Sequence, residues 1–401
     1  RRQRQMCIRD RVCCSDSGSD GCDLNGRQFL ELLDNANLFV IPLDDEREWF
    51  RYHHLFQALL KRQLQQRLSA DDIAELHKLA SAWFAENGYI EEALSHAHES
   101  GDIEVAARLI KQHRHIIMNH EQWYWLSRWL KRFPPDYKQN NPDLLLAKAW
   151  VRQRQARYPE LFDLLDRIEQ VVSLSNKFTA DSLFCGEVQA LKSFQYYATG
   201  RGDVAEVAAR AALNSLPAQY HSSRGFALLI LSVALQMQGD PGQARRVVLE
   251  ALQQEAASIA IYKTSLLAAL CYASWIAADL NSLKLQTDQL LKHGTKNDLP
   301  ESIAIGRLFT GILHYQRNDL DLAERFLAPV AQTPGSGELI VPSIVTYCQS
   351  SFALALTYQA TGRAEEAGRI VDSMIGYMLE TGHADLLEVC RGFRAGLALR
   401  Q

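Results

Sequence analysis

The 401-residue chain lacks the short motifs on which most nucleotide-binding and catalytic sites depend. No Gly-x4-Gly-Lys-Ser/Thr phosphate loop occurs at any position, so the sequence offers no such site for ATP. It contains no Gly-x-Ser-x-Gly elbow, and no cysteine stands beside a histidine in a pattern typical of nucleophilic catalysis. We therefore expect that the chain is not an enzyme, has no catalytic residues and holds no cofactor.

Long apolar runs and a strong charge imbalance are also missing. The most apolar windows, Phe226–Leu235 and Ser265–Ala278, are shorter than the roughly 18–20 residues that a membrane-spanning helix needs. A net charge of −4 provides no general attraction to nucleic acid or to a membrane. No stretch has the charged, apolar and small-residue order of a signal peptide. These absences predict a cytoplasmic protein that makes no contact with a membrane.

The eight cysteines do not form a metal-binding pattern. Four of them crowd the first 22 residues, namely Cys7, Cys13, Cys14 and Cys22. These four lack the two Cys-x2-Cys pairs that a zinc site of this kind needs, so we expect no bound metal. The other four lie in helical patterns and are expected to be small, buried apolar residues: Cys185, Cys271, Cys348 and Cys390.

A short phrase that recurs between Lys192 and Thr381 is the main positive feature. It occurs as Gly-Asp-Pro-Gly-Gln-Ala at 239–244, Asp-Leu-Asn-Ser-Leu at 279–283, Asn-Asp-Leu-Asp-Leu-Ala at 318–323 and Gly-Arg-Ala-Glu-Glu-Ala at 362–367. The equivalent residues are 39, 40 and 44 positions apart: Asp240, Asp279, Asp319 and Arg363. Each phrase separates two helical patterns. The spacing predicts stacked helix–turn–helix repeats that form a right-handed superhelix.

The first residues differ from the rest of the chain. Residues 1–24 contain five arginines, a Ser-Asp-rich stretch and no apolar periodicity. The segment 2–11 also resembles translated sequencing-adapter sequence. We expect 1–24 to be a disordered or artefactual leader, and the alternative is a basic tail that binds nucleic acid.

The segment 25–68 has the pattern of a partial winged-helix domain. An amphipathic helix ends near Leu33, and the residues 38–43 and 49–52 form two strands of a predicted hairpin. A helix then begins at His53, with leucines and a phenylalanine at spacings of three and four. Helix, hairpin and helix in this order correspond to the second half of a winged helix.

These residues carry a family resemblance. Leu-Asp-Asn-Ala-Asn-Leu-Phe-Val-Ile-Pro-Leu-Asp-Asp-Glu at 33–46 and Trp-Phe-Arg-Tyr-His-His-Leu-Phe at 49–56 resemble the winged-helix arm of the MalT family. Its members are large ATP-dependent LuxR-type transcriptional activators. The similarity continues through helical segments at 82–93, 100–110, 126–134 and 142–150.

The resemblance implies an all-α fold apart from the one hairpin. A helical linker with the first helical pairs would occupy 69–135, and a tetratricopeptide-like superhelical sensor domain would occupy 136–401. ATP would bind only in a nucleotide-binding module that this sequence does not contain. No basic helix–turn–helix follows Arg363, so we expect no direct nucleic-acid binding by this chain. Self-association would belong to the full-length form.

The repeat phase predicts one candidate ligand-binding surface. Four residues before the repeated Asp or Arg lie Gln236, Trp275, Tyr315 and Gln359. One helical turn earlier lie Val233, Tyr272, Ile312 and Leu356. In tetratricopeptide-like units the first helix of each pair lines the concave side. Aromatic faces beside amides suit a small polar ligand such as an oligosaccharide, and the alternative is that these side chains only pack between repeats.

The other polar and aromatic residues are assigned structural roles. We expect His53 to cap a helix and His54 to pack under the hairpin, because adjacent histidines on a helix cannot share one ion. Further histidines lack ligand spacing and are expected at the surface: His96, His98, His113, His115 and His120. An aromatic cluster is expected in a core: Trp123, Tyr124, Trp125 and Trp129. Paired carboxylates are expected at turns or helix starts: Asp44, Asp45, Asp71, Asp72, Glu365 and Glu366.

Two functions fit this sequence. The first is the signal-sensing and oligomerisation-control part of a LuxR-type transcriptional activator, which binds a small-molecule inducer in the superhelix. The second is a tetratricopeptide-type adaptor that holds a regulatory protein in its groove. A walled surface of aromatics and amides favours the sensor, whereas an exposed apolar or strongly charged groove favours the adaptor.

Overall fold

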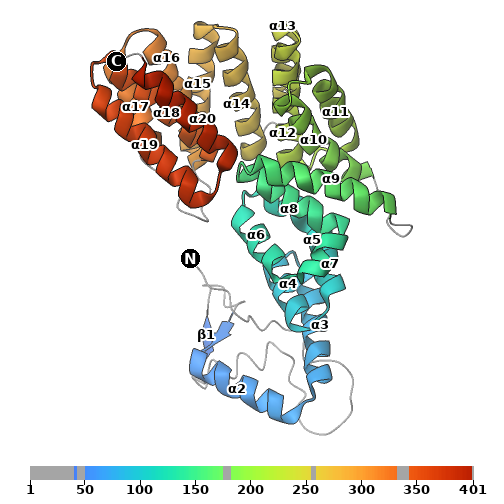
Figure 1. Ribbon diagram of the computed structural model, residues 1–401. Helices are drawn as coiled ribbons and strands as arrows, with labels where there is room; N and C mark the ends of the chain where they lie inside the picture. The colour runs from blue at the N-terminus through green and yellow to red at the C-terminus, as the bar shows by residue number, and fades with distance from the viewer. Residues whose placement is uncertain (1–39, 43–49, 175–181, 254–258, 332–342, 400–401) are drawn as a thin grey trace. The chain divides into compact units, whose positions relative to one another are not determined.

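The computed structural model describes residues 40–42, 50–174, 182–253, 259–331 and 343–399. These residues are mainly α-helical, which confirms the predicted fold class (Figure 1). The chain divides into two compact units, Arg1–Leu109 and Ile110–Gln401. The division falls inside the predicted segment 69–135, and the predicted domain boundaries stay predictions. The predicted leader 1–24, with its four cysteines, lies outside the described residues, as do Leu33, Asp44 and Asp45.

The N-terminal unit contains two short strands followed by helices. β1 (Val40–Pro42) pairs antiparallel with β2 (Phe50–Tyr52), with Ile41 opposite Arg51, and the residues that join them lie outside the described ones. The helices that follow are α2 (His54–Arg67), α3 (Ala70–Glu86) and α4 (Ile90–Glu99). α5 (Ile103–Asn119) begins in this unit and ends in the next.

Two of the predicted histidine roles are wrong. His53 occupies the N-cap position of α2, but its side chain makes no capping hydrogen bond. His54 is exposed and does not pack beneath the strands. The carboxylate prediction holds for α3, where Ser69 and Asp72 form a reciprocal capping box that satisfies free N–H groups at the helix start.

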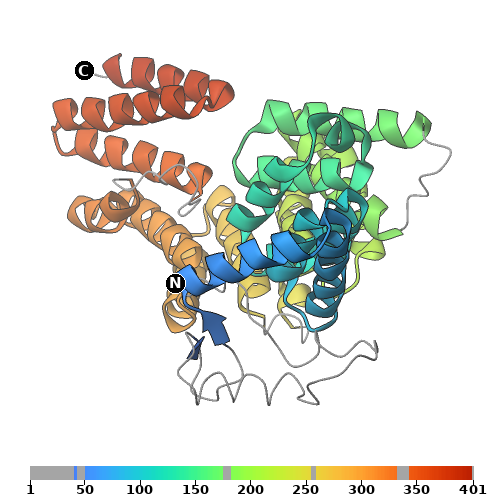
Figure 2. The same cartoon turned by 90° about the horizontal axis from the view of Figure 1, so that it is seen from below.

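The C-terminal unit is a series of antiparallel helical pairs. After α5 it contains α6 (Trp123–Arg132), α7 (Pro135–Asn140), α8 (Pro142–Arg154), α9 (Tyr158–Leu174), α10 (Ser182–Ala198), α11 (Gly202–Ser215), α12 (His221–Met237), α13 (Pro241–Leu252), α14 (Ala260–Ile276), α15 (Leu280–Lys296), α16 (Pro300–Gln316), α17 (Leu320–Ala331), α18 (Ile344–Ala360), α19 (Ala364–Thr381) and α20 (Ala384–Ala398) (Figures 1 and 2). Within the described residues, no helix has both the length and the apolar character needed to cross a bilayer.

One residue with a left-handed backbone marks the turn inside each pair. The equivalent residues are Ala156, Gly200, Gly239, Ala278, Asn318 and Gly362, with φ between 51° and 84°. The carboxylates of Asp240 and Asp279 then accept N–H groups from the second helix at 2.8 and 3.0 Å. These are N-caps, and Glu365 and Glu366 lie in the first turn of α19. The structure confirms the repeat phase inferred from the sequence.

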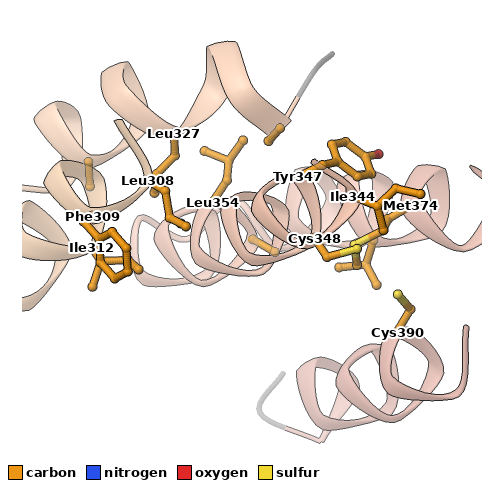
Figure 3. Close-up of a cluster of buried hydrophobic side chains, with 14 of the residues drawn as sticks. Leu308, Phe309, Ile312, Leu327, Ile344, Tyr347, Cys348, Leu354, Met374 and Cys390 are labelled. Carbon is orange, nitrogen blue, oxygen red and sulfur yellow. The ribbon is translucent and has the colours of Figure 1, made fainter. Parts of the chain in front are cut away.

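A large core runs through α14 to α20. It contains Leu308 and Phe309 of α16, Leu327 of α17 and Tyr347 of α18, among others (Figure 3). Small residues let the paired helices approach closely: an added Cβ on Gly311 of α16 would meet Leu327 Cγ at 2.4 Å. Of the four scattered cysteines, Cys185 is exposed, contrary to expectation, and the other three are buried.

We predict that Gly311→Ala lowers the free energy of unfolding by about 1–3 kcal/mol, because the methyl group overpacks the contact with Leu327. Gly392→Ala in α20 is the matched control, since nothing lies within 4 Å of its added Cβ. Removing a helical glycine there should raise the free energy of unfolding by roughly 0.5–1 kcal/mol. Urea denaturation followed by circular dichroism measures both. Equal stability of Gly311→Ala and the parent chain would contradict the packing argument.

Candidate ligand-binding wall

The first helices of successive pairs line the concave side of the superhelix. Tyr272 Oη in α14 hydrogen-bonds Gln349 Oε1 in α18 at 2.8 Å, across the intervening α16. Trp150 in α8 likewise contacts Phe226 in α12, across α10, with ring centroids 5.6 Å apart. Contacts that skip one repeat require the first helices to converge. α8, α10, α12, α14, α16 and α18 therefore form the inner layer.

The four predicted positions lie at equivalent places in this layer, each three residues before the left-handed turn residue. All four are half-buried. Trp275 packs edge-to-face on Phe309, with ring centroids 5.9 Å apart, and Tyr315 packs against the same core. Gln359 donates from Nε2 to the backbone oxygen of Leu397 at 3.3 Å.

Gln236 differs from the other three. Its amide nitrogen and oxygen are both shielded from solvent, and neither has a hydrogen-bond partner within the described part of the chain. A buried amide without partners is unfavourable by about 1–3 kcal/mol. A ligand or a water molecule that supplied a donor and an acceptor would remove this penalty. Gln236 is therefore the wall position that most clearly needs a polar partner.

The row one helical turn deeper is mainly packing. Val233 and Ile312 are buried, while Tyr272 and Leu356 are half-buried. Burial strongly raises the pKa of the Tyr272 phenol, so this hydroxyl stays neutral. The hydrogen bond with Gln349 offsets part of the increase in pKa. Its ring meets Phe309 edge-on at a centroid distance of 4.8 Å. The deeper row supports the wall rather than facing a ligand.

The same phase adds two residues that the sequence prediction missed. Gln153 of α8 and Tyr197 of α10 stand three residues before Ala156 and Gly200, and both are half-buried. The repeated phrase is anchored on Asp240 and therefore leaves these two earlier pairs unaligned. Gly200 followed by Arg201 was the available signal, since the pair at Gly362 has the same form. We call Gln153, Tyr197, Gln236, Trp275, Tyr315 and Gln359 the wall.

A buried ion cluster fixes α5 to the start of this layer. Arg114 is 3% exposed and donates from Nε to Glu187 Oε2 of α10 at 2.9 Å. Its Nη1 lies 3.4 Å from Oδ1 of Asp143 in α8. The other oxygen of this carboxylate, Oδ2, pairs with Lys111. Burial opposes the charged form of Arg114, but the two carboxylates raise its pKa above the ordinary value. The charge on α5 is therefore held in place by two repeats.

Asn119 provides a second attachment for α5. Its Nδ2 donates to the backbone oxygen of Gln219 at 2.7 Å, and its Oδ1 accepts the N–H of Ser222 at 3.0 Å. The second bond satisfies a free N–H group at the start of α12. The end of α5 is thus joined to α8, α10 and α12.

The remaining sequence assignments are mixed. Three histidines predicted at the surface make ring contacts or are partly buried. His96 lies against His77 with Nδ1 atoms 2.8 Å apart, His115 stacks on Tyr220, and His113 is half-buried. Burial lowers the pKa of His96 to about 4. Trp123 and Trp129 are buried as expected, whereas Tyr124 is exposed. No group of metal-ligating side chains occurs among the described residues.

Comparison with known families decides what this architecture belongs to. The MalT winged helix domain matches residues 6–72, and the MalT-like TPR region matches residues 186–399. The chain belongs to the MalT family. The first match begins inside the segment expected to be a leader. A curated relative, the HTH-type transcriptional regulator MalT of Yersinia pestis, is 34% identical over 200 residues. That match covers half of this chain and 22% of the relative.

One solved structure supports the fold, and a second is a weaker match. A signal-transduction ATPase with a tetratricopeptide repeat sensor from Pyrococcus horikoshii has a TM-score of 0.55 at 13% identity. The match covers 93% of this MalT-family chain and 55% of that protein. The match to the apo form of RapI covers 82% of this chain and 98% of the RapI chain, with a TM-score of 0.43 and 10% identity. The first of these shows a shared helical-repeat fold.

We predict that Gln236→Leu leaves the free energy of unfolding unchanged or raises it, because an unpaired buried amide is replaced by an apolar group of similar size. Gln349→Leu is the matched control. It removes the partner of the buried Tyr272 hydroxyl and should destabilise by about 1–3 kcal/mol. Thermal and urea denaturation distinguish the two variants. A large loss of stability in Gln236→Leu would show that its amide has a partner within the fold.

We predict that Arg114→Met destabilises the C-terminal unit by about 3–5 kcal/mol, since it leaves Glu187 and Asp143 buried without their cation. Arg391→Ala, which removes an exposed pair with Glu388, should change stability by about 1 kcal/mol or less. Urea denaturation midpoints compare the two. An Arg114→Met chain as stable as Arg391→Ala would exclude the cluster as the attachment of α5.

Proposed function

We propose that this chain is the signal-sensing region of a MalT-family transcriptional regulator and that a small polar inducer binds at the wall. The observation that carries the proposal is the buried Gln236 amide, which has no partner within the described residues. It stands in the inner layer at the position equivalent to Tyr197 in the preceding repeat and Trp275 in the following one. A ligand with apolar CH faces and hydroxyl groups, such as an oligosaccharide, fits a wall of aromatic rings and amides.

Binding at this wall would act through the conformation of the repeats. A ligand shifts an equilibrium only when it binds one conformation better than another. The wall residues come from six inner helices, so a ligand that touches several of them favours one curvature of the superhelix. α5 is held by Arg114 and Asn119 to three of those helices. In the full-length regulator, this change would favour the ATP-bound, self-associating form.

The proposal assigns no catalysis, ATP binding or DNA binding to this chain. ATP belongs to a nucleotide-binding module and DNA recognition to a separate module of the full-length regulator. The absence of a phosphate loop from the sequence supports this assignment, and the matched region covers 22% of the relative.

A regulatory protein is the second candidate ligand. Met237 and Ile276 follow Gln236 and Trp275 directly and are 46% and 55% exposed. They occupy equivalent positions in consecutive repeats and therefore place two apolar side chains along one edge of the wall. Exposed apolar side chains in a row are typical of protein-binding surfaces.

We predict that a thermal-shift screen of the chain against sugars, amino acids and nucleotides finds a ligand that raises the melting temperature in a concentration-dependent way. Trp275→Ala and Tyr315→Ala should each weaken its binding roughly tenfold, which corresponds to about 1.4 kcal/mol. Gln236→Leu should also weaken binding while the chain stays folded. Tyr124→Ala on α6 is the control, because its exposed ring lies outside the wall.

Two outcomes would contradict the sensor proposal. The first is that no compound of the panel binds while a peptide or protein does, and that Met237→Ser and Ile276→Ser abolish this interaction. The second is that Trp275→Ala and Tyr315→Ala unfold the domain, which would identify these rings as packing residues only. Isothermal titration calorimetry on each folded variant separates loss of binding from loss of structure.

A further inference from the structure

The turn between α8 and α9 lies against the turn between α19 and α20, near the other end of the chain. Arg157 donates from Nη2 to the backbone oxygen of Thr381 at 2.8 Å. His383 Nε2 donates to the backbone oxygen of Gln155 at 2.8 Å. The bonded residues are 224 and 228 positions apart in the sequence. Figures 1 and 2 both show the start of α9 beside this second turn.

The apolar part of this contact is well buried. Ala156, between the two polar contacts, is 2% exposed and belongs to the core formed by α14 to α20. Tyr158 packs against the same core. Burial raises the pKa of the Tyr158 phenol, and the nearby ionisable groups of Tyr272, Asp385 and Cys348 raise it further. The first inner pair therefore shares a core with the last ones.

His383 is suited to hold this position. Its ring is almost fully buried, and Nδ1 lies 2.8 Å from Thr381 Oγ1. Only Nε2–H can donate to the carbonyl of Gln155, while the Thr381 hydroxyl donates its single proton to the backbone oxygen of Tyr377 at 2.6 Å. One imidazole thus links the two turns and fixes the residue that begins α20.

A second seam lies beside the first. Arg154 Nη2 at the end of α8 is 3.9 Å from Glu121 Oε1 and 3.9 Å from Glu301 Oε2. Glu301, at the start of α16, also accepts the N–H of Ser343 at 2.8 Å and the hydroxyl of Thr346 at 3.1 Å. The end of α8 is therefore tied to the beginnings of α16 and α18.

Stacked repeats do not require such contacts, because each repeat ordinarily touches only its neighbours. Joining the α8–α9 turn to the α19–α20 turn closes the superhelix, and the wall then faces the interior of the closed unit. Two hydrogen bonds and the side chains of Ala156 and Tyr158 join the two turns, whereas neighbouring repeats pack along the length of whole helices. The seam is thus the place where the closed unit separates most readily.

We propose that Gln155, Arg157, Thr381 and His383 form a clasp that opens and closes the superhelix and so controls access to the wall. The open form keeps every helical pair intact and loses the contacts of the clasp, those of the Arg154 seam and the packing of Ala156 and Tyr158 against the core of α14 to α20. The closed form holds the wall residues in the geometry described above. The gating role rests on the proposed ligand site, whereas the opening itself does not.

The test combines Arg157→Ala with His383→Ala and follows the chain without ligand. We expect unchanged helix content by circular dichroism and a larger radius of gyration by small-angle X-ray scattering. Hydrogen exchange should rise about tenfold or more in the peptides that contain the two turns, since each lost bond shifts the equilibrium by about that factor. Arg391→Ala, an exposed substitution on α20, is the matched control and should leave all three readouts unchanged.

The clasp is refuted if the double variant keeps its radius and its exchange rates, because the contacts would then be incidental. If the double variant loses its helical signal, Arg157→Lys replaces it. Lysine keeps the charge but has no guanidinium to reach Thr381 beside Glu160, so the same local increase in exchange is expected. Unchanged exchange in this folded variant would also refute the proposal. None of these readouts uses a ligand, so failure of the sensor function and failure of the clasp are separable.

Discussion

Each inner helix of this superhelix must reverse direction within about three residues, and one residue with a left-handed backbone makes that reversal possible. Glycine adopts this conformation without strain, as at Gly239, whereas an alanine with the same geometry costs about 1–2 kcal/mol. Ala278 and Ala156 nevertheless occupy it. The turn fixes which face of the preceding helix points inward. The wall, the N-caps and the spacing of the repeats all depend on it.

The turn at Ala156 shows how local strain and long-range contact are connected. A left-handed alanine is unfavourable in isolation, but here its side chain is buried in the core that α14 to α20 share. Burial of this turn offsets part of the strain and places the oxygen of Gln155 opposite His383. The geometry of one hairpin therefore contributes to the closure of the whole C-terminal unit.

The first repeats are joined to α5 by charge rather than by apolar contact alone. Arg114 lies between Glu187 and Asp143, and removal of one partner would leave an unpaired buried charge. α5 is continuous with the N-terminal unit. The contacts of Arg114 and Asn119 therefore fix the C-terminal part of α5 to α8, α10 and α12.

The sequence by itself determined the helical class, the repeat phase and four wall positions, because hydrophobic periodicity and turn chemistry are local properties. It could not align Gln153, since the Gln155-Ala156-Arg157 turn has neither glycine nor aspartate to mark it, whereas Gly200 and Arg201 do mark the turn after Tyr197. It also misplaced His54 and His96, whose burial depends on neighbouring helices. The contacts between the clasp residues follow only from the tertiary structure. Residues 228 positions apart meet through the rotation summed over all the repeats, and no local pattern encodes that sum.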